Sequence, residues 1–297
     1  MTVKNRSRIC LMVSGAIMVI ALIMTIFGHG INLGIDFEGG LSMEYDLKTS
    51  AVKGDLEQIL KDMGVASYTV TYQGSDENQA VIRVKDVAQD DIQNIQAQFE
   101  EAVKAKYPEA ESIGDVNYVG PVAGAALVRN AVVSVLLAAA LMLIYIAIRF
   151  DFNSGVSAVF GLLHDVLIML SFMVIFRSFI QMNSPFIAAA LTIVGYSINN
   201  TIVIFDRIRD NAKKMPTAPR EEVTNISIQE SLGRTICTTA TTLITIVALC
   251  ILGVASIREF ALPIIIGICS GVYSANMING YVWAYLEEKR RTRKVKA

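Results

Sequence analysis

Residues that carry catalytic or metal chemistry are scarce in this sequence. It has two histidines and four cysteines, and 18% of its residues are charged, whereas soluble proteins average about 25%. It contains no Gly-x-Ser-x-Gly motif, no P-loop and no His-Glu-x-x-His motif. We therefore expect neither an enzyme nor a nucleotide-driven pump. We also expect no cofactor, no bound metal and no nucleic-acid partner.

The few cysteines predict no cross-links. Cys10, Cys237, Cys250 and Cys269 all fall in apolar runs, and none lies in the segment between the first two runs. They have neither the context of a disulfide framework nor the spacing of metal ligands. We interpret them as small apolar packing residues.

Hydrophobic residues are in excess. They make up 53% of the chain and gather in six runs of roughly 20 residues, enough to cross a hydrocarbon core of roughly 30 Å. The runs lie near residues 9–29, 129–148, 156–176, 186–206, 235–254 and 262–284. The first is longer than the apolar core of a cleaved signal peptide, which favours a retained helix. The sequence thus predicts a multi-pass α-helical membrane protein with six transmembrane helices.

Basic residues accumulate on one side of these six helices. They precede the first run and follow the second, fourth and sixth, whereas the opposite short loops hold only Arg177 and Arg258. Because cytoplasmic loops are enriched in Lys and Arg, both termini are predicted to be cytoplasmic.

The membrane part of the chain is predicted to divide into three segments. They are the N-terminus with the first helix (1–30), a five-helix block (121–288) with a cytoplasmic loop (207–234), and a basic cytoplasmic tail (289–297). Within that loop, residues 220–232 form either a helix on the membrane surface or a plain connector.

Residues 31–120 have ordinary soluble composition, and by this topology they lie outside the cytoplasm. Strand-like patterns at 41–47, 67–72, 80–84 and 113–119 alternate with helical spacing at 52–63 and 90–107, and a turn is expected at 74–78. The order β-α-β-β-α-β predicts an external ferredoxin-like α+β domain. One helix, one external domain and five further helices are the plan of half an RND-type transporter, so a partner of the same design is implied.

Polar residues interrupt the third and fourth apolar runs. His164 and Asp165 lie near the middle of the third. An ionisable residue at that depth is costly, so Asp165 either has a function or bonds to a neighbouring helix and holds the bundle together. The two side chains point about 100° apart on a helix, so they need not share a partner. Ser197, Asn200 and Thr201 have the spacing of one helix face in the fourth run.

Two further features concern the fifth and sixth runs. Arg234 is predicted at the start of the fifth helix, where it is either a functional cation or a side chain that extends to the membrane interface. Gly267 and Gly271 form a small-xxx-small pair, which favours close packing of the sixth helix.

Several of these stretches together resemble SecF, a subunit of the bacterial SecDF protein-export complex. In chain order they are Leu33 to Gly40, Val119 to Pro121, Arg149 to Asp151, His164-Asp165, Gly195 to Arg209, and Arg234 to Leu243. The first holds Asp36, Gly39 and Gly40 in a motif at the start of the external domain, where the glycines permit positive φ. The stretch from Gly195 to Arg209 is the most specific.

The resemblance implies an accessory subunit of the Sec protein translocase in the bacterial cytoplasmic membrane. Such a subunit acts in the lipid bilayer with a SecD-like subunit and the translocon channel, and it assists export of unfolded polypeptide by means of an ion gradient. The candidate ion-path or coupling residues are Asp165, Asn200, Arg234, His164, Ser197 and Thr201.

Asn200 departs from the family pattern, which often has aspartate there as part of the ion path. An amide neither binds nor releases a proton near pH 7. Either the partner chain performs the coupling, or Asn200 serves as a neutral ligand. Two alternatives remain beside the ion-driven subunit: a stabiliser of the translocon that does not couple to ions, and half of an RND-type exporter of lipids or small molecules. Exporters of the latter kind usually carry both halves in one chain.

Overall fold

The chain folds into two compact units. The computed structural model describes residues 3–52, 54–73, 78–85, 87, 91–113, 116–177, 180–253 and 255–296. The larger unit comprises Met1–Asn32 and Val132–Ala297, and the smaller unit is Leu33–Ala131.

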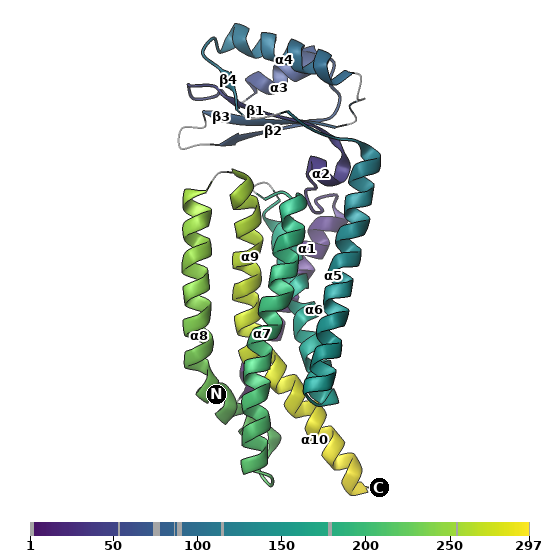
Figure 1. Ribbon diagram of the computed structural model, residues 1–297, viewed down its shortest axis with the longest axis vertical. Coiled ribbons are helices and arrows are strands. Elements are labelled where there is room, and N and C mark those ends of the chain that lie inside the picture. The colour runs from purple at the N-terminus through teal and green to yellow at the C-terminus, as the bar shows by residue number, and fades with distance from the viewer. Residues whose placement is uncertain are drawn as a thin grey trace. The chain divides into compact units, whose positions relative to one another are not determined.

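The smaller unit is an α+β domain whose two longer helices lie on one face of a sheet (Figure 1). Its elements are α2 (Ile35–Glu38), β1 (Gly40–Asp46), α3 (Asp55–Asp62), β2 (Tyr68–Gln73), β3 (Gln79–Val84), α4 (Ile92–Lys106), β4 (Glu111–Ser112) and β5 (Asn117–Val119). The predicted order of strands and helices is confirmed. Residues 74–77 of the predicted turn lie outside the described part of the chain.

The sheet has the antiparallel order of a ferredoxin-like domain. Strand β1 lies between β3 and the last two strands, and β2 pairs with the far side of β3. The single last strand predicted at 113–119 is wrong, because it is two short pieces that pair with opposite ends of β1. Directly after β4, the Ile113 amide also donates to the Glu44 carbonyl of β1 at 2.8 Å.

The domain core forms between the sheet and the two longer helices. Alternate residues of β1, including Leu41 and Met43, are buried and pack in one cluster with Leu56 and Leu60 of α3 and Phe99 of α4. Burying a side chain of this size stabilises a fold by about 1.5–3 kcal/mol. The period-two pattern of β1 and the helical spacing of α3 are therefore both explained by this single core.

A tight turn leads from α2 into β1 at Gly39 and Gly40. Both have positive φ, 83° and 132°, a region that side chains with a Cβ rarely adopt. A Cβ at Gly40 would lie 2.4 Å from the Val84 carbonyl oxygen of β3. The paired glycines thus allow β1 to begin directly against its neighbouring strand.

A polar contact joins the start of α3 to the end of α4. The Lys106 ammonium lies 2.8 Å from one Asp55 oxygen, and the Tyr107 hydroxyl donates to the other at 2.9 Å. These two partners, Lys106 first, hold the pKa of Asp55 below its usual value. A lowered folded-state pKa adds stability above the unfolded-state pKa, and that stability is lost as the pH falls through the folded value.

We therefore expect Asp55→Asn to make the domain more susceptible to pepsin at pH 5, with the difference from the unmodified chain shrinking towards pH 2. Asp62→Asn is the matched control, because Asp62 lies on the same helix and accepts from Gln58, not from a cation. The measurement is the rate of pepsin cleavage within residues 33–131 of the full chain in nanodiscs. Identical pH profiles for Asp55→Asn and Asp62→Asn would contradict the expectation.

The larger unit is a helical bundle (Figure 1). Its helices are α1 (Val3–Ile26), α5 (Pro121–Arg149, which begins in the smaller unit), α6 (Phe152–Ile175), α7 (Ser184–Lys214), α8 (Arg220–Leu252), α9 (Ala255–Ser274) and α10 (Gly280–Lys296). A π-helical turn, Ala275–Asn279, connects α9 to α10. Within the described residues, six helices are long and apolar enough to cross a membrane, with α9, the π turn and α10 contributing one of them. The predicted number of transmembrane helices is confirmed.

The structure corrects the predicted loop at 207–234. Helix α7 continues to Lys214 and α8 begins at Arg220, so the connection between them is residues 215–219. The polar stretch is helical because one side of it is buried: Ile208 packs in a core cluster, and the Asn211 amide donates to Ser227 and Glu230 of α8 at 3.1 and 2.6 Å. Residues 220–232 are likewise the first turns of the fifth membrane helix and not a separate helix.

Candidate functional site

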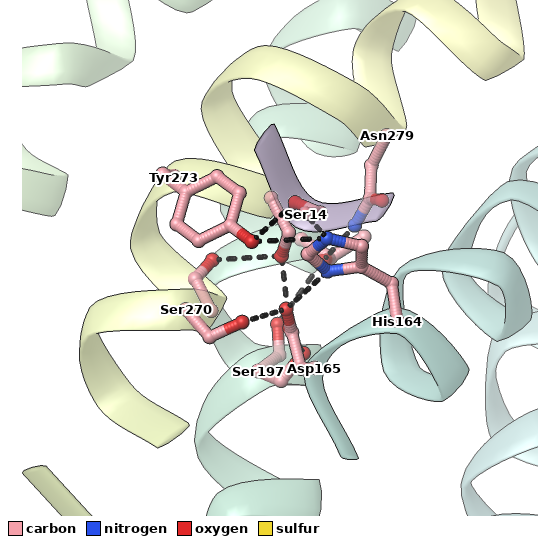
Figure 2. A network of polar contacts seen from close by, with 10 residues as sticks. Ser14, His164, Asp165, Ser197, Ser270, Tyr273 and Asn279 are labelled. Carbon is pink, nitrogen blue, oxygen red and sulfur yellow. Dashed lines mark hydrogen bonds and ion pairs between the residues drawn. The ribbon is translucent and has the colours of Figure 1, made fainter. Parts of the chain in front are cut away.

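Asp165 is completely buried at the centre of the larger unit, where four side chains contact its carboxylate (Figure 2). Ser197 of α7 donates to Oδ2 at 2.6 Å, and Ser270 and Ser274 of α9 donate to Oδ1 and Oδ2 at 2.7 and 2.8 Å. The fourth contact is His164 Nδ1, 3.0 Å from Oδ1. The predicted pair of His164 and Asp165 is therefore joined directly, although the two residues also have separate partners.

His164 connects this carboxylate to the first helix. Its Nε2 lies 2.8 Å from the Ser14 hydroxyl of α1 and 3.0 Å from the Tyr273 hydroxyl of α9. Those two hydroxyls lie 2.8 Å from each other. Residues from α1, α6, α7 and α9 thus form one continuous polar network, shown in Figure 2.

The number of donors matches an ionised carboxylate. A carboxylate offers about four acceptor positions, and Asp165 has three serine hydroxyls and one imidazole nitrogen around it. An ionised aspartate at the centre of a membrane helix costs about 2.5–3.5 kcal/mol, and each hydrogen bond to a charged group contributes about 1.5–3 kcal/mol. The four contacts are enough to offset that cost.

The same geometry can accommodate one additional proton. When His164 Nδ1 donates to Asp165, a neutral imidazole presents Nε2 as an acceptor to Ser14 or Tyr273. Protonation of Nε2 turns that nitrogen into a donor, and the two hydroxyls accommodate the change by rotating. Both ring nitrogens of His164 therefore lie within hydrogen-bonding distance of a partner.

Two glycines bring α9 close to this site. A Cβ on Gly267 would meet the Ile193 side chain at 2.3 Å, and one on Gly271 would lie 3.4 Å from the Cα of Ser197 and 3.5 Å from the Asp165 carboxylate. The predicted close packing at this small-xxx-small pair is confirmed. A Cβ at Gly267 would require the Ile193 side chain to move, whereas one at Gly271 would make ordinary van der Waals contact, so Gly267 matters most for the close approach of α9 to α7.

The fourth-run polar residues have different environments. Ser197 contacts Asp165 directly, whereas Thr201 donates to the Ser197 carbonyl at 3.0 Å and accepts from Asn279 at 2.8 Å. Asn200 is also buried, but its Nδ2 has no hydrogen-bond partner among the described residues. The face predicted for Ser197, Asn200 and Thr201 does point into the bundle.

Four other predicted residues do not join this network. Arg234 lies within α8 and not at its start, its side chain is exposed, and no ion pair to it is found in the described part of the chain. Asp36, Gly39 and Gly40 belong to the smaller unit. The sequence predicts a helix start at Arg234 because the polar residues before it have the composition of a loop.

The sequence prediction missed five members of the network, namely Ser14, Ser270, Tyr273, Ser274 and Asn279. One signal was present, because Ser270 and Ser274 are spaced i, i+4 around Gly271 in an otherwise apolar run. The π-helical turn is a second signal that only the structure provides, and such turns occur frequently at functional sites.

The described residues around Asp165 do not form a metal site. In the ranges described by the structure, no group of three or more His, Cys, Asp or Glu side chains is arranged to hold a metal ion. The oxygens around Asp165 are the hard ligands that sodium would accept, but each hydroxyl already donates to the carboxylate. The four cysteines are free thiols.

Two family profiles match this chain. The profile described as "Protein export membrane protein SecD/SecF, C-terminal" matches residues 98–289. The profile described as "SecD/SecF GG Motif" matches residues 25–51, which include the paired glycines of the smaller unit.

Individual relatives match over most of the chain. The protein translocase subunit SecF of Rhodothermus marinus is 35% identical over 289 residues, which cover 95% of this chain and 91% of that protein. SecF of Alicyclobacillus acidocaldarius is 36% identical over 283 residues, covering 93% and 90%. The protein translocase subunit SecDF of Bacillus subtilis is 34% identical over 268 residues, covering 89% of this chain but 35% of that longer protein.

Solved structures match as well. The crystal structure of SecDF from Thermus thermophilus, described as a translocon-associated membrane protein, superposes with a TM-score of 0.84 at 31% identity, and the match covers 96% of this chain and 38% of that one. A structure of SecDF in a super-membrane-facing form superposes with a TM-score of 0.68 at 30% identity, covering 100% and 40%. This chain therefore spans less than half of each SecDF chain.

Proposed function

This chain belongs to the SecD/SecF family of protein-export membrane proteins, and we propose that it couples an ion gradient to export through the network around Asp165. The observation that carries the proposal is the complete burial of Asp165 among four donors in a membrane helix. A second observation that supports the proposal is that His164 links this carboxylate to the hydroxyls of Ser14 and Tyr273. Proton or sodium flow would change the charge of this network, and α1, α7 and α9 would respond because they supply its partners.

A SecD-like subunit is the proposed partner. Bacillus subtilis SecDF and the SecDF crystal structure are single chains of which this chain matches 35% and 38%, so a second, larger part that accounts for the remaining 65% and 62% would complete the unit. Helix α5 supports this view, because none of its most apolar window is buried within the chain. That surface is available to lipid or to the helices of a partner. The Sec translocon channel and the exported polypeptide are proposed as further partners because of the family to which this chain belongs.

The proposed orientation places both termini in the cytoplasm and the ferredoxin-like domain outside it. It is supported by Arg149 at the end of α5 and by the basic residues that follow the membrane-spanning part of α7 and the sixth span. A cysteine introduced at Ser75 should be labelled by a membrane-impermeant reagent only from outside the cell. Labelling from the cytoplasmic side only would overturn this orientation.

Asn200 tests whether α7 takes part in coupling. Asn200→Leu removes a buried amide whose Nδ2 has no hydrogen-bond partner among the described residues, so we expect the bundle to keep its stability while the response of export to the gradient falls. Asn200→Asp has nearly the same shape, so we expect it to be tolerated in assembly and to change the pH dependence of export. The measurement is export of a reporter into inverted membrane vesicles that contain the SecD-like partner, with a proton or sodium gradient imposed or collapsed.

The matched control for these variants is Asn199→Leu, because Asn199 is adjacent on α7 but exposed. A gradient response that is the same for the unmodified chain, Asn200→Leu and Asn200→Asp would show that α7 is a scaffold. Export that ignores both gradients in the unmodified chain would favour the stabiliser that does not couple to ions.

A further inference from the structure

A cavity of about 430 Å³ lies at the C-terminal end of α5. None of the residues that contact Asp165 lines it. It is formed where α5 ends and α6 begins, together with α7, α8 and α10. Arg149 lies just beyond the membrane span Val122–Ile146, and Ser154 lies in the first turn of the span Phe152–Ile175. The cavity therefore lies at the level of one membrane–water interface.

The cavity is lined by four cations, namely Arg149, Arg209, Lys213 and Arg220. Its two lining carboxylates already have partners. Asp151 caps α6 by accepting from the Ser154 amide at 3.1 Å and from the Ser154 hydroxyl. Glu287 accepts from Asn153 at 2.6 Å and from Arg290 at 3.0 Å.

Arg220 is the strongest evidence for a ligand. Its side chain lines the cavity, the residue is 8% exposed, and its Nε and Nη1 have no hydrogen-bond partner among the described residues. Guanidinium groups are always charged and are almost never fully buried without a partner. A buried donor without a partner is costly, so an oxyanion that accepts these N–H groups would relieve the cost.

Arg209, which also lines the cavity, likewise has a buried guanidinium N–H group without a partner among the described residues. Its Nη2 donates to Asp206 at 2.6 Å, but its buried Nε has no partner within the part of the chain that is described. The Arg149 and Arg209 guanidinium carbons each lie 5.4 Å from the centre of the Phe150 ring, which holds both groups in place. Arg149 also lies 3.8 Å from Asp206. Even with Asp206 counted, four cations face three carboxylates, so the site keeps a net positive charge.

We propose that this cavity binds a phosphate group, supplied either by the headgroup of an anionic phospholipid or by free inorganic phosphate. Planar guanidinium groups bind phosphate oxygens through paired hydrogen bonds, and the unpartnered N–H groups of Arg209 and Arg220 provide them. The position at the ends of membrane spans is where phospholipid phosphates lie. This binding does not depend on whether ions pass through the Asp165 network.

The two sources are distinguished by two arms of one experiment on the purified full chain. In the first, native mass spectrometry measures retention of phosphatidylglycerol from mixed micelles with phosphatidylcholine. In the second, the shift in thermal unfolding temperature is measured with inorganic phosphate, with chloride at equal ionic strength as reference. The variants are Arg220→Gln and Lys213→Gln, and the matched control is Lys214→Gln, which neighbours Lys213, is exposed and does not line the cavity.

We expect Arg220→Gln to weaken binding by about tenfold or more, since it removes charge-assisted hydrogen bonds, and Lys213→Gln by about threefold. Lys214→Gln should bind like the unmodified chain. Lys213 is exposed, so its variant keeps the test valid if Arg220→Gln fails to fold. Weaker binding in both variants supports the site. The arm in which the binding weakens, phosphatidylglycerol or inorganic phosphate, identifies the source of the phosphate group. Unchanged binding in Lys213→Gln and in folded Arg220→Gln, in both arms, overturns the proposal.

Discussion

Asp165→Asn is expected to lower the gradient-dependent part of export by more than tenfold while leaving the amount of protein in the membrane unchanged. Asparagine keeps the shape of the side chain but cannot gain or lose a proton near pH 7. It also replaces one oxygen by an NH₂ group, which faces serine hydroxyls that now donate to Asp165. The bundle can adjust by rotating these hydroxyls, so we expect loss of coupling and not loss of the fold. The measurement is reporter export in vesicles with and without the imposed gradient.

Two further variants show whether the effect is specific. Asp36→Asn changes a carboxylate in the smaller unit and should retain most of the gradient response. Ser270→Ala removes one of the four donors to Asp165 and keeps the carboxylate, so its effect should be intermediate. Equal export by the unmodified chain and Asp165→Asn, at matched protein levels, would reject a coupling role for Asp165.

Gly40→Ala is expected to destabilise the ferredoxin-like domain by about 3 kcal/mol or more, from backbone strain and overpacking together. At a φ of 132° its new Cβ would lie 2.4 Å from the Val84 carbonyl, which is backbone and cannot rotate away. The strand pair would have to separate where Leu41 faces Val84. Hydrogen exchange of the β1 amides, measured on the full chain in nanodiscs, should become much faster.

Gly64→Ala is the control that introduces backbone strain without a steric clash. Gly64 also has a positive φ, 75°, but a Cβ there would meet nothing within 4 Å. It should therefore cost about 1–2 kcal/mol, which is the strain of the left-handed conformation by itself. Similar exchange rates in the two variants would mean that the contact with Val84 is unimportant.

The sequence was informative where a single segment determines its own structure. Run length was sufficient to predict the six membrane helices, and the alternation in β1 was sufficient to predict a half-buried strand. The predicted loop at 207–234 failed because its polar residues are buried against a neighbouring helix. Asn211 and Ser227 look like loop residues in a hydropathy pattern, yet they bond to each other inside the bundle.

The candidate site was predicted in part for the same reason. Asp165 and Ser197 stand out because a carboxylate and a hydroxyl in a mid-membrane helix need partners. Ser14 did not stand out, because a serine can satisfy its hydroxyl on its own helix. One of its two partners, His164, is 150 residues away in the chain, and the packing of α1 against α6 brings the two together.

The π-helical turn at Ala275–Asn279 sets the rotational phase of the sixth membrane span. A π turn contains one residue more than an α-helical turn. The side chains that follow it therefore point about 100° away from the directions they would have in a continuous α-helix. Before the turn, Ser270 and Ser274 face Asp165, and after it the buried positions resume at Trp283 and Glu287. Deleting one residue within the turn would restore an uninterrupted α-helix and rotate Trp283 and Glu287 out of phase with the bundle, while the two serines kept their places. The π turn therefore allows the serines of α9 and the buried residues of α10 to face the bundle within one membrane span.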